Sequence, residues 1–160
     1  MRGAKVVELP RCKMVSSGHA DGVDPFAAGG KLSLFNRWWS QIDSERTEKF
    51  YPRDFLWYDR EARKLVWYYA LPDGMEDTGG YQVVDFEGGM YVAHISTNGD
   101  EADGEQVYRD IKKWVAESGC FELDERPGHY DLCHVTTPKA AQEAMGYSQL
   151  DIYVPIKVKA

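Results

Sequence analysis

The sequence predicts an α+β fold in which a β-α-β-β unit is duplicated, giving antiparallel sheets with helices on one side. Two observations lead to this prediction. Apolar residues alternate along short segments and recur at helical spacing along two longer ones, and the order of these segments is similar in both halves of the 160-residue chain. We expect one domain over residues 1–160, with halves of about 1–75 and 80–160 and a central ligand groove between them.

Strands are expected where short apolar segments lie between residues that favour turns, namely Gly, Pro, Asn and Asp. A connector carrying Pro52 leads into a hairpin whose turn is expected at residues 59–63. The segment at residues 11–18 is either a second strand or a continuation of the first. The expected strands are residues 5–9, 11–18, 54–58, 64–71, 81–86, 90–97, 120–123, 130–135 and 150–158.

Helices are expected from stripes of apolar residues and from the signals that end a helix. The first covers residues 31–42, and the second covers residues 101–117 with Gly119 as its C-terminal stop. A short third helix precedes Gly146, which ends it. Thr137 is expected to cap the N-terminus of this third helix, because a threonine hydroxyl readily accepts a hydrogen bond from a free helical amide.

The net charge of −7 argues against direct binding of nucleic acid, because phosphate backbones are bound by concentrated Lys and Arg. The same charge is also compatible with a simple role in solubility.

The cysteines and the lack of long apolar segments indicate the compartment. Three cysteines without paired spacing, Cys12, Cys120 and Cys133, suit a reducing compartment. The N-terminal segment has no apolar run typical of a signal peptide, and no segment approaches the length of a membrane span. We therefore expect a cytoplasmic protein that does not enter a membrane.

The sequence lacks the motifs of several enzyme classes. Its Gly-Gly pairs do not have the spacing of a phosphate-binding loop, and it contains no Gly-x-Ser-x-Gly nucleophile elbow. His129, Cys133 and His134 do not have the spacing of a metal site. On a strand, Cys133 and His134 would point to opposite faces. We therefore expect neither a metal ion nor a cofactor.

Aromatic residues make up 13% of the chain, which is more than a core of this size requires. If the hairpin pairs its strands so that their rings face each other, four rings line one surface, and the tryptophans of the first helix can face them. Alternatively, each ring belongs to the core. The set consists of Trp38 and Trp39 in the helix, Phe55 and Trp57 in one strand of the hairpin, and Trp67 and Tyr69 in the other.

A pocket for a cation also requires an acidic residue. Asp151 and Tyr153 share one face of the last strand, and three aliphatic residues share the other face. The aliphatic face must belong to the core, so Asp151 and Tyr153 face either water or the groove. A carboxylate in an aromatic pocket needs a partner or water, and an incoming cation would supply that partner. The lesser candidates for this acid are Asp131, Asp85 and Glu122.

Three segments are similar to one known family. Residues 146–157 read Gly-Tyr-Ser-Gln-Leu-Asp-Ile-Tyr-Val-Pro-Ile-Lys, residues 81–91 form a strand with a Glu-Gly-Gly turn, and residues 34–39 read Leu-Phe-Asn-Arg-Trp-Trp. Together they resemble the closing segment, the central strand and turn, and the helix of GyrI-like small-molecule-binding domains. These domains also occur as the effector-binding domains of AraC-type and MerR-type regulators. The resemblance covers nearly the whole chain.

The resemblance implies two fused β-α-β-β units with a central groove that binds varied, often cationic and aromatic compounds between aromatic walls near an acidic residue. Some stand-alone members resemble hydrolases that open strained cyclopropane rings, with a glutamate that helps to activate water. Family members often carry a glutamate after a proline in the penultimate region, whereas Asp131 is the nearest acid after Pro127 in this chain. No helix-turn-helix segment precedes the first strand, so we expect a stand-alone domain rather than a complete transcription factor.

The leading hypothesis is therefore a module that binds small lipophilic or cationic organic ligands, for sensing or sequestration, with Asp151 or Asp131 supplying the charge. One alternative is a hydrolase of electrophilic small molecules that uses the same pocket. Another alternative is a protein-interaction module, such as a gyrase inhibitor, whose protein partner the sequence does not identify. The expected pocket walls are Trp38, Trp39, Trp57, Trp67, Tyr69 and Tyr91.

Overall fold

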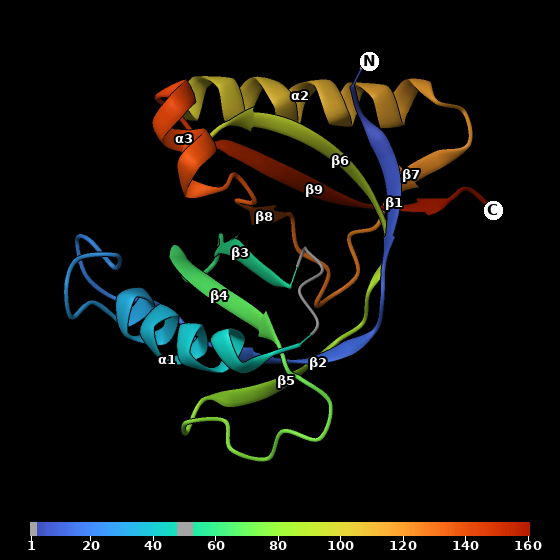
Figure 1. Ribbon diagram of the computed structural model, residues 1–160. Coiled ribbons are helices and arrows are strands. Elements are labelled where there is room, and N and C mark those ends of the chain that lie inside the picture. Colours follow the sequence, from blue (N-terminus) through green and yellow to red (C-terminus); the bar gives the residue numbers. More distant parts are fainter. Residues whose placement is uncertain (1–2, 48–52) are drawn as a thin grey trace. The chain divides into compact units, whose positions relative to one another are not determined.

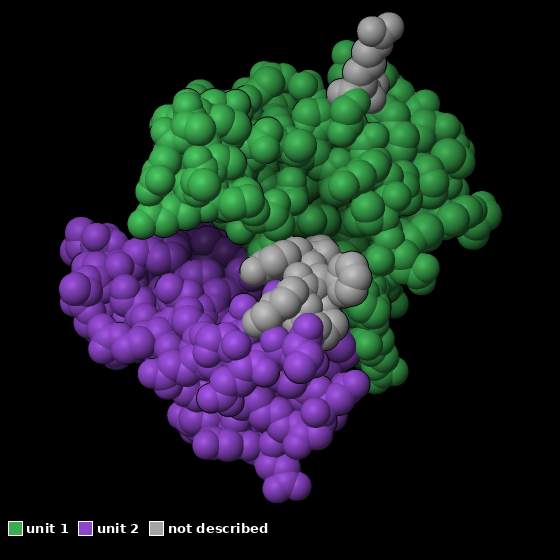
Figure 2. All heavy atoms as spheres, viewed as in Figure 1, with its two compact units in different colours: residues 1–11, 87–160 green, residues 12–86 purple. Residues whose placement is uncertain are grey.

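The computed structural model describes residues 3–47 and 53–160, and its chain divides into two compact units, which are coloured separately in Figure 2. Unit 1 consists of residues 1–11 and 87–160, and unit 2 consists of residues 12–86. Helices and antiparallel strands occur in both units, so the predicted α+β class is confirmed. Every strand and helix expected from the sequence has a counterpart, whereas the expected connector carrying Pro52 falls largely outside the described residues.

The bounds of the elements, labelled as in Figure 1, differ from the expected ones by a few residues at most. In the described residues they are β1 (Lys5–Leu9), β2 (Cys12–Ser16), α1 (Lys31–Glu45), β3 (Asp54–Asp59), β4 (Lys64–Ala70), β5 (Gln82–Phe86), β6 (Gly89–Thr97), α2 (Glu101–Glu117), β7 (Phe121–Leu123), β8 (Leu132–His134), α3 (Lys139–Met145) and β9 (Gln149–Val158).

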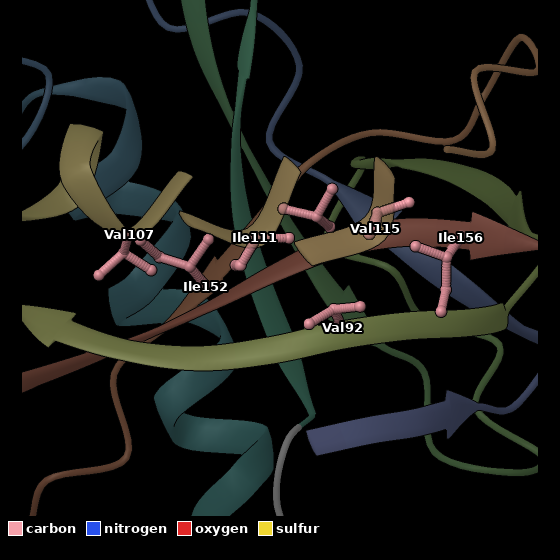
Figure 3. Close-up of a cluster of buried hydrophobic side chains, with 7 residues drawn as sticks. Val92, Val107, Ile111, Val115, Ile152 and Ile156 are labelled. Carbon is pink, nitrogen blue, oxygen red and sulfur yellow. The ribbon is translucent and has the colours of Figure 1, made fainter. Parts of the chain in front are cut away.

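The sheet of unit 1 has the strand order β8-β9-β6-β1, and β7 also pairs with β9. Helix α2 lies along β6 and β9 (Figure 1) and begins at Asp100, whose side chain accepts a hydrogen bond from the Asp103 amide at 3.0 Å. The helix buries one apolar stripe against the sheet, and Figure 3 shows these side chains pointing toward one another. The cluster consists of Val107, Ile111 and Val115 from α2 with Val92, Ile152, Val154 and Ile156 from the sheet.

The short helix α3 does not have the cap expected from the sequence. Its N-cap is Pro138, and no side chain caps it. The hydroxyl of Thr137 instead accepts a hydrogen bond from the backbone amide of Gln149 at 2.8 Å, so it connects the start of α3 to the start of β9. The predicted cap is therefore wrong, because the strand amide competes for the same hydroxyl. Gly146, with φ of +80°, ends α3 as expected.

The sheet of unit 2 has the strand order β3-β4-β2-β5, and α1 packs on one face of it. Leu32, Phe35 and Trp39 are the buried residues of α1. The order strand, helix, strand, strand therefore occurs once in each unit, as β2-α1-β3-β4 and as β6-α2-β8-β9. In unit 2 one further strand completes the sheet, since β5 pairs with β2. In unit 1 there are two further strands: β1 pairs with β6, and β7, which lies between α2 and β8 in the chain, pairs with β9.

No helix in the described part of the chain is long and apolar enough to cross a membrane.

Candidate ligand-binding surfaces

The register of the β3–β4 hairpin separates the aromatic residues that the sequence predicted on one surface. Asp59 pairs with Lys64 and Leu56 pairs with Trp67. Phe55 and Trp57 therefore point to one face of the sheet, while Trp67 and Tyr69 point to the other. The predicted wall of four rings on one face of the hairpin is wrong.

The turn between β3 and β4 explains this register. The side chain of Asp59 accepts hydrogen bonds from the backbone amides of Glu61 and Ala62 at 2.9 and 3.0 Å, which is a local turn motif of aspartate. Arg63 has φ of +53° and completes the turn. Asp59 consequently belongs to the paired strand, and the turn contains residues 60–63 instead of the expected 59–63. A shift of one residue moves every side chain of a strand to the opposite face.

The face of unit 2 that α1 covers, here called its helix face, holds four of the predicted wall residues. The Trp39 ring lies 4.5 Å from that of Trp67 and 4.8 Å from that of Tyr69. Trp38 contacts Tyr81 with ring centroids 4.9 Å apart. The two contacts of Trp39 are edge-to-face, and such contacts stabilise a core beyond the area that they bury. Trp38, Trp39, Trp67 and Tyr69 therefore pack between α1 and the sheet.

The hydroxyl of Tyr69 belongs to a network of charged side chains at the C-terminal end of α1. Arg46 donates to this hydroxyl at 3.1 Å, and the hydroxyl donates to Asp43 at 3.3 Å. Arg53, whose side chain is only 6% exposed, pairs with the same Asp43 carboxylate at 3.2 Å. Burial raises the pKa of Tyr69 above its ordinary value. The network satisfies the polar end of Tyr69, as a buried tyrosine requires.

The opposite face of unit 2, here called its far face, carries a second set of rings. Trp57 and Tyr68 lie on neighbouring strands with ring centroids 5.6 Å apart. Phe55 stacks on Phe86 at 6.0 Å. Phe55 and Trp57 are buried, whereas Tyr68 is half-buried. Two predicted wall residues, Phe55 and Trp57, thus share a face with rings that sequence reasoning did not select.

The sheet of unit 1 also has a helix face, toward α2, and a far face. Ile152, Val154 and Ile156 of β9 pack against α2, so Asp151 and Tyr153 belong to the far face, as predicted. Cross-strand pairing arranges this far face in rows. The rows are Ile95, Asp151 and His134; then Ala93, Tyr153 and Leu132; then Tyr91 and Pro155.

The carboxylate of Asp151 is half-buried and accepts a hydrogen bond of 3.5 Å from the Tyr153 hydroxyl. In the described ranges, no Lys, Arg or His nitrogen lies within 4 Å of this carboxylate. Tyr153 is buried, and burial together with the Asp151 charge raises its pKa, so the hydroxyl keeps its proton and remains a donor. Ile95, on the other side of Asp151, is 48% exposed.

Tyr91, a further predicted wall residue, lies beside a charged cluster in which Asp124 is buried and the Arg126 side chain is exposed. Asp124 is buried and accepts hydrogen bonds from Arg126 Nε at 2.8 Å and Nη2 at 2.7 Å. His129 Nδ1 lies 3.4 Å from the same carboxylate. The Arg126 hydrogen bonds lower the pKa of Asp124, while burial and then the Asp124 charge raise the pKa of Tyr91. Sequence reasoning missed this cluster, although the spacing of Asp124 and Arg126 within one loop was visible.

The remaining candidates occupy separate places in unit 1. Asp131 is half-buried and directly precedes β8. Cys133 and His134 point to opposite faces, as expected: the Cys133 thiol lies 3.9 Å from the Tyr108 hydroxyl of α2, and His134 belongs to the far face. Burial raises the pKa of the Cys133 thiol, which disfavours the reactive thiolate.

Unit 2 also contains an open cavity of about 660 Å³ at the end of α1, which none of the predicted wall residues lines. Its residues come from the last turn of the helix and from the loop after β4. They are Ile42, Glu45, Arg46, Thr47, Leu71, Pro72, Asp73, Gly74 and Met75.

No protein family model and no curated protein matches this chain. Solved structures do match. The C-terminal domain of EcmrR has a TM-score of 0.62 at 14% identity, with 96% of both chains covered. A hydrolase from Listeria innocua has a TM-score of 0.61 at 16% identity, covering 98% of this chain and 92% of that one. SAV2435, solved with bound tetraphenylphosphonium, has a TM-score of 0.53 at 11% identity, covering 96% and 93%. The fold that the sequence resemblance implied is therefore confirmed.

Proposed function

We propose that this chain is a GyrI-like domain that binds lipophilic, aromatic or cationic small molecules, and that the far face of unit 1 is a ligand surface. The observation that carries the proposal is the carboxylate of Asp151. It is half-buried beside the apolar side chain of Ile95, and its one hydrogen bond among the described residues comes from Tyr153. A carboxylate in this setting lacks the compensating charge that buried acids usually have, and a cationic ligand would provide it.

The rings on the far face of unit 1 support an aromatic ligand. Tyr153 and Tyr91 lie on this face, in the two rows that follow the row of Asp151. Aromatic faces attract flat and cationic groups, with about 0.5–2 kcal/mol per contact. SAV2435, which shares the fold, was solved with tetraphenylphosphonium, a lipophilic aromatic cation. This ligand is therefore a suitable first probe for the present chain.

Calorimetric titration with tetraphenylphosphonium and with neutral triphenylphosphine oxide tests the proposal. We expect Asp151→Asn to weaken binding of the cation by about tenfold or more, and to leave binding of the neutral compound unchanged. Asp85→Asn is the matched control, because it removes one acid from a strand of unit 2, and Asp131→Asn tests the other predicted acid. Loss of cation binding in Asp131→Asn alone would transfer the role to Asp131. Absence of saturable binding by the wild type would contradict the proposal.

A hydrolase is the second candidate function. The Listeria innocua hydrolase has the same fold, and the hydrogen-bonded Asp151 and Tyr153 pair could orient a water molecule beside a bound electrophile. Mass spectrometry after incubation with cyclopropane-containing electrophiles would detect a product heavier by one water. Turnover that is abolished in Asp151→Asn would support this function, and an intact compound after long incubation would exclude it for that compound class.

We also propose that nucleic acid is not a direct partner. The net charge of −7 is unfavourable for phosphate backbones, whose binding depends on concentrated positive charge. The expected role is therefore sensing or sequestration of the small molecule.

A further inference from the structure

We infer that the cavity at the C-terminal end of α1 is a second ligand site, which takes an aliphatic ammonium, that is, a hydrocarbon body carrying a protonated amine. The cavity is lined by residues of unit 2 and measures about 660 Å³, within the range of roughly 300–1,000 Å³ that is common for small-molecule sites. The inference is independent of the proposed function, which concerns the far face of unit 1. The two sites should therefore differ in the residues they use and in the ligands they select.

The apolar part of the cavity lining is aliphatic. Ile42 comes from the C-terminal part of α1, while Leu71, Pro72 and Met75 come from the loop that follows β4. Ile42 and Leu71 also pack against the aromatic cluster between α1 and the sheet, which holds them in place. No aromatic ring occurs among the described lining residues. This lining favours an alkyl group, which gains by leaving water, over a flat ring that gains by stacking.

The loop wall of the cavity is held by hydrogen bonds and by close packing. The amide of Leu71 donates to a carbonyl of β2 at 3.0 Å, and the amide of Met75 donates to the carbonyl of Pro72 at 3.2 Å. Further along the loop, Gly79 lies so close to the Trp38 indole that a Cβ would not fit there. A wall that is already ordered reduces the entropy that a ligand loses on binding.

The charges around the cavity favour a cation. Glu45 and Asp73 are exposed, and among the described residues neither carboxylate has a hydrogen-bonding or ion-pairing partner. The last turn of α1 contains no basic residue and adds the negative end of the helix dipole. Arg46 is the one cation in the described lining, and it donates to the Tyr69 hydroxyl at 3.1 Å and to the Ala70 carbonyl at 3.5 Å, two groups outside the lining. The charge of the lining is therefore negative on balance.

An ammonium with free N–H groups suits this cavity better than the aromatic cation proposed for unit 1. Carboxylates form their strongest hydrogen bonds with charged N–H donors. The charge of tetraphenylphosphonium is instead surrounded by phenyl rings and offers no N–H group. The surface beside Asp151 carries tyrosine rings, whereas the cavity beside Glu45 and Asp73 carries aliphatic side chains. Each site thus matches a different kind of lipophilic cation.

Calorimetric titration with octylammonium, and with octanol as the neutral reference of equal chain length, tests the inference. We expect the wild type to bind octylammonium at least about fivefold more tightly than octanol. In the double variant Glu45→Gln with Asp73→Asn, the two affinities should become equal. Glu61→Gln with Glu125→Gln is the matched control, because it removes two exposed carboxylates outside the cavity and changes the net charge equally. The control should keep the wild-type preference.

Two further variants separate the lining from the rim and one site from the other. Met75→Ala removes apolar lining and no charge, so it should weaken both probes by a similar factor of about three. Asp151→Asn should leave octylammonium binding unchanged, and the double variant of Glu45 and Asp73 should leave tetraphenylphosphonium binding unchanged. Each site is thereby tested with its own probe.

Three results would overturn the inference: no saturable binding of octylammonium, a preference for octylammonium that persists when Glu45 and Asp73 are both replaced, or loss of octylammonium binding in Asp151→Asn. The last result would assign the amine to unit 1. Expected behaviour of octylammonium without any binding of tetraphenylphosphonium would support the second site and contradict the proposed function alone.

Discussion

The helix face and the far face of each sheet differ in the kind of side chain they carry. The helix face of unit 1 is aliphatic and that of unit 2 is aromatic, and both contact a helix of their own unit. The far face of unit 1 instead mixes two tyrosines, a carboxylate and an imidazole with apolar residues. The ionisable network on the helix face of unit 2 is internally paired, whereas the carboxylate of Asp151 on the far face of unit 1 has one tyrosine hydroxyl as its partner among the described residues. We therefore attribute stability to the helix faces, and place the proposed recognition on the far face of unit 1.

The largest expected effect is on the helix face of unit 2. Phe35 is completely buried and its ring contacts those of Trp38, Trp39 and Tyr81, so Phe35→Ala should lower the free energy of unfolding by about 3–5 kcal/mol. Urea denaturation measures the loss, and tetraphenylphosphonium affinity at a temperature where the variant is folded should stay at the wild-type value. A stability loss below about 1 kcal/mol would break the comparison.

The charged cluster beside Tyr91 should give the next largest effect, and it links the far face of unit 1 to stability. Asp124→Asn removes the negative charge that accepts hydrogen bonds from Arg126, and should lower the free energy of unfolding by about 1.5–3 kcal/mol. Folding lowers the pKa of Asp124, so its carboxylate stabilises the fold at pH values above the unfolded pKa of about 3.9. This stabilisation is lost as the pH falls through the lower pKa of the folded state. The variant should therefore lose less stability than the wild type on acidification, as followed by circular dichroism. Parallel acid profiles would contradict this assignment.

The far face of unit 2 provides a smaller effect on stability. Trp57→Phe keeps an aromatic ring but removes part of the buried surface that packs beside Tyr68. We expect the free energy of unfolding to fall by about 1–2 kcal/mol, less than for Phe35→Ala. Urea denaturation measures the loss, and a loss as large as that of Phe35→Ala would remove the distinction between the two faces.

The smallest effect concerns the end of a helix and is independent of either far face. Asp100→Ala removes the side chain that accepts a hydrogen bond from the Asp103 amide at the start of α2. The free energy of unfolding should fall by about 1 kcal/mol, and ligand affinity should not change. Thermal unfolding of the variant, compared with Asp100→Asn, which keeps a capping oxygen, isolates the contribution of the cap. An equal loss in both variants would mean that charge, not the hydrogen bond, stabilises this end.

The sequence predicted the bounds of helix α2 because its apolar stripe and Gly119 agree, whereas the cap at Asp100 was seen only in the structure. Helix α1 extends three residues beyond the expected end, since Asp43, Ser44 and Glu45 are polar and carry no apolar periodicity. The faces of the β3–β4 hairpin were not predictable in the same way, because they depend on one residue of turn length. That length is set by hydrogen bonds of the Asp59 side chain, which strand periodicity does not reveal.

The position of β1 has a consequence for how the chain folds during synthesis. Unit 2 is one continuous segment, residues 12–86, whereas unit 1 needs β1 from the start of the chain to pair with β6. Lys5 pairs with Ala93, so the first strand leaves the ribosome long before its neighbour exists. Contacts between such distant residues form late and slow the folding of the part that contains them. Unit 2 can thus fold first, while the edge of β1 that pairs with β6 stays unpaired until β6 has been synthesised.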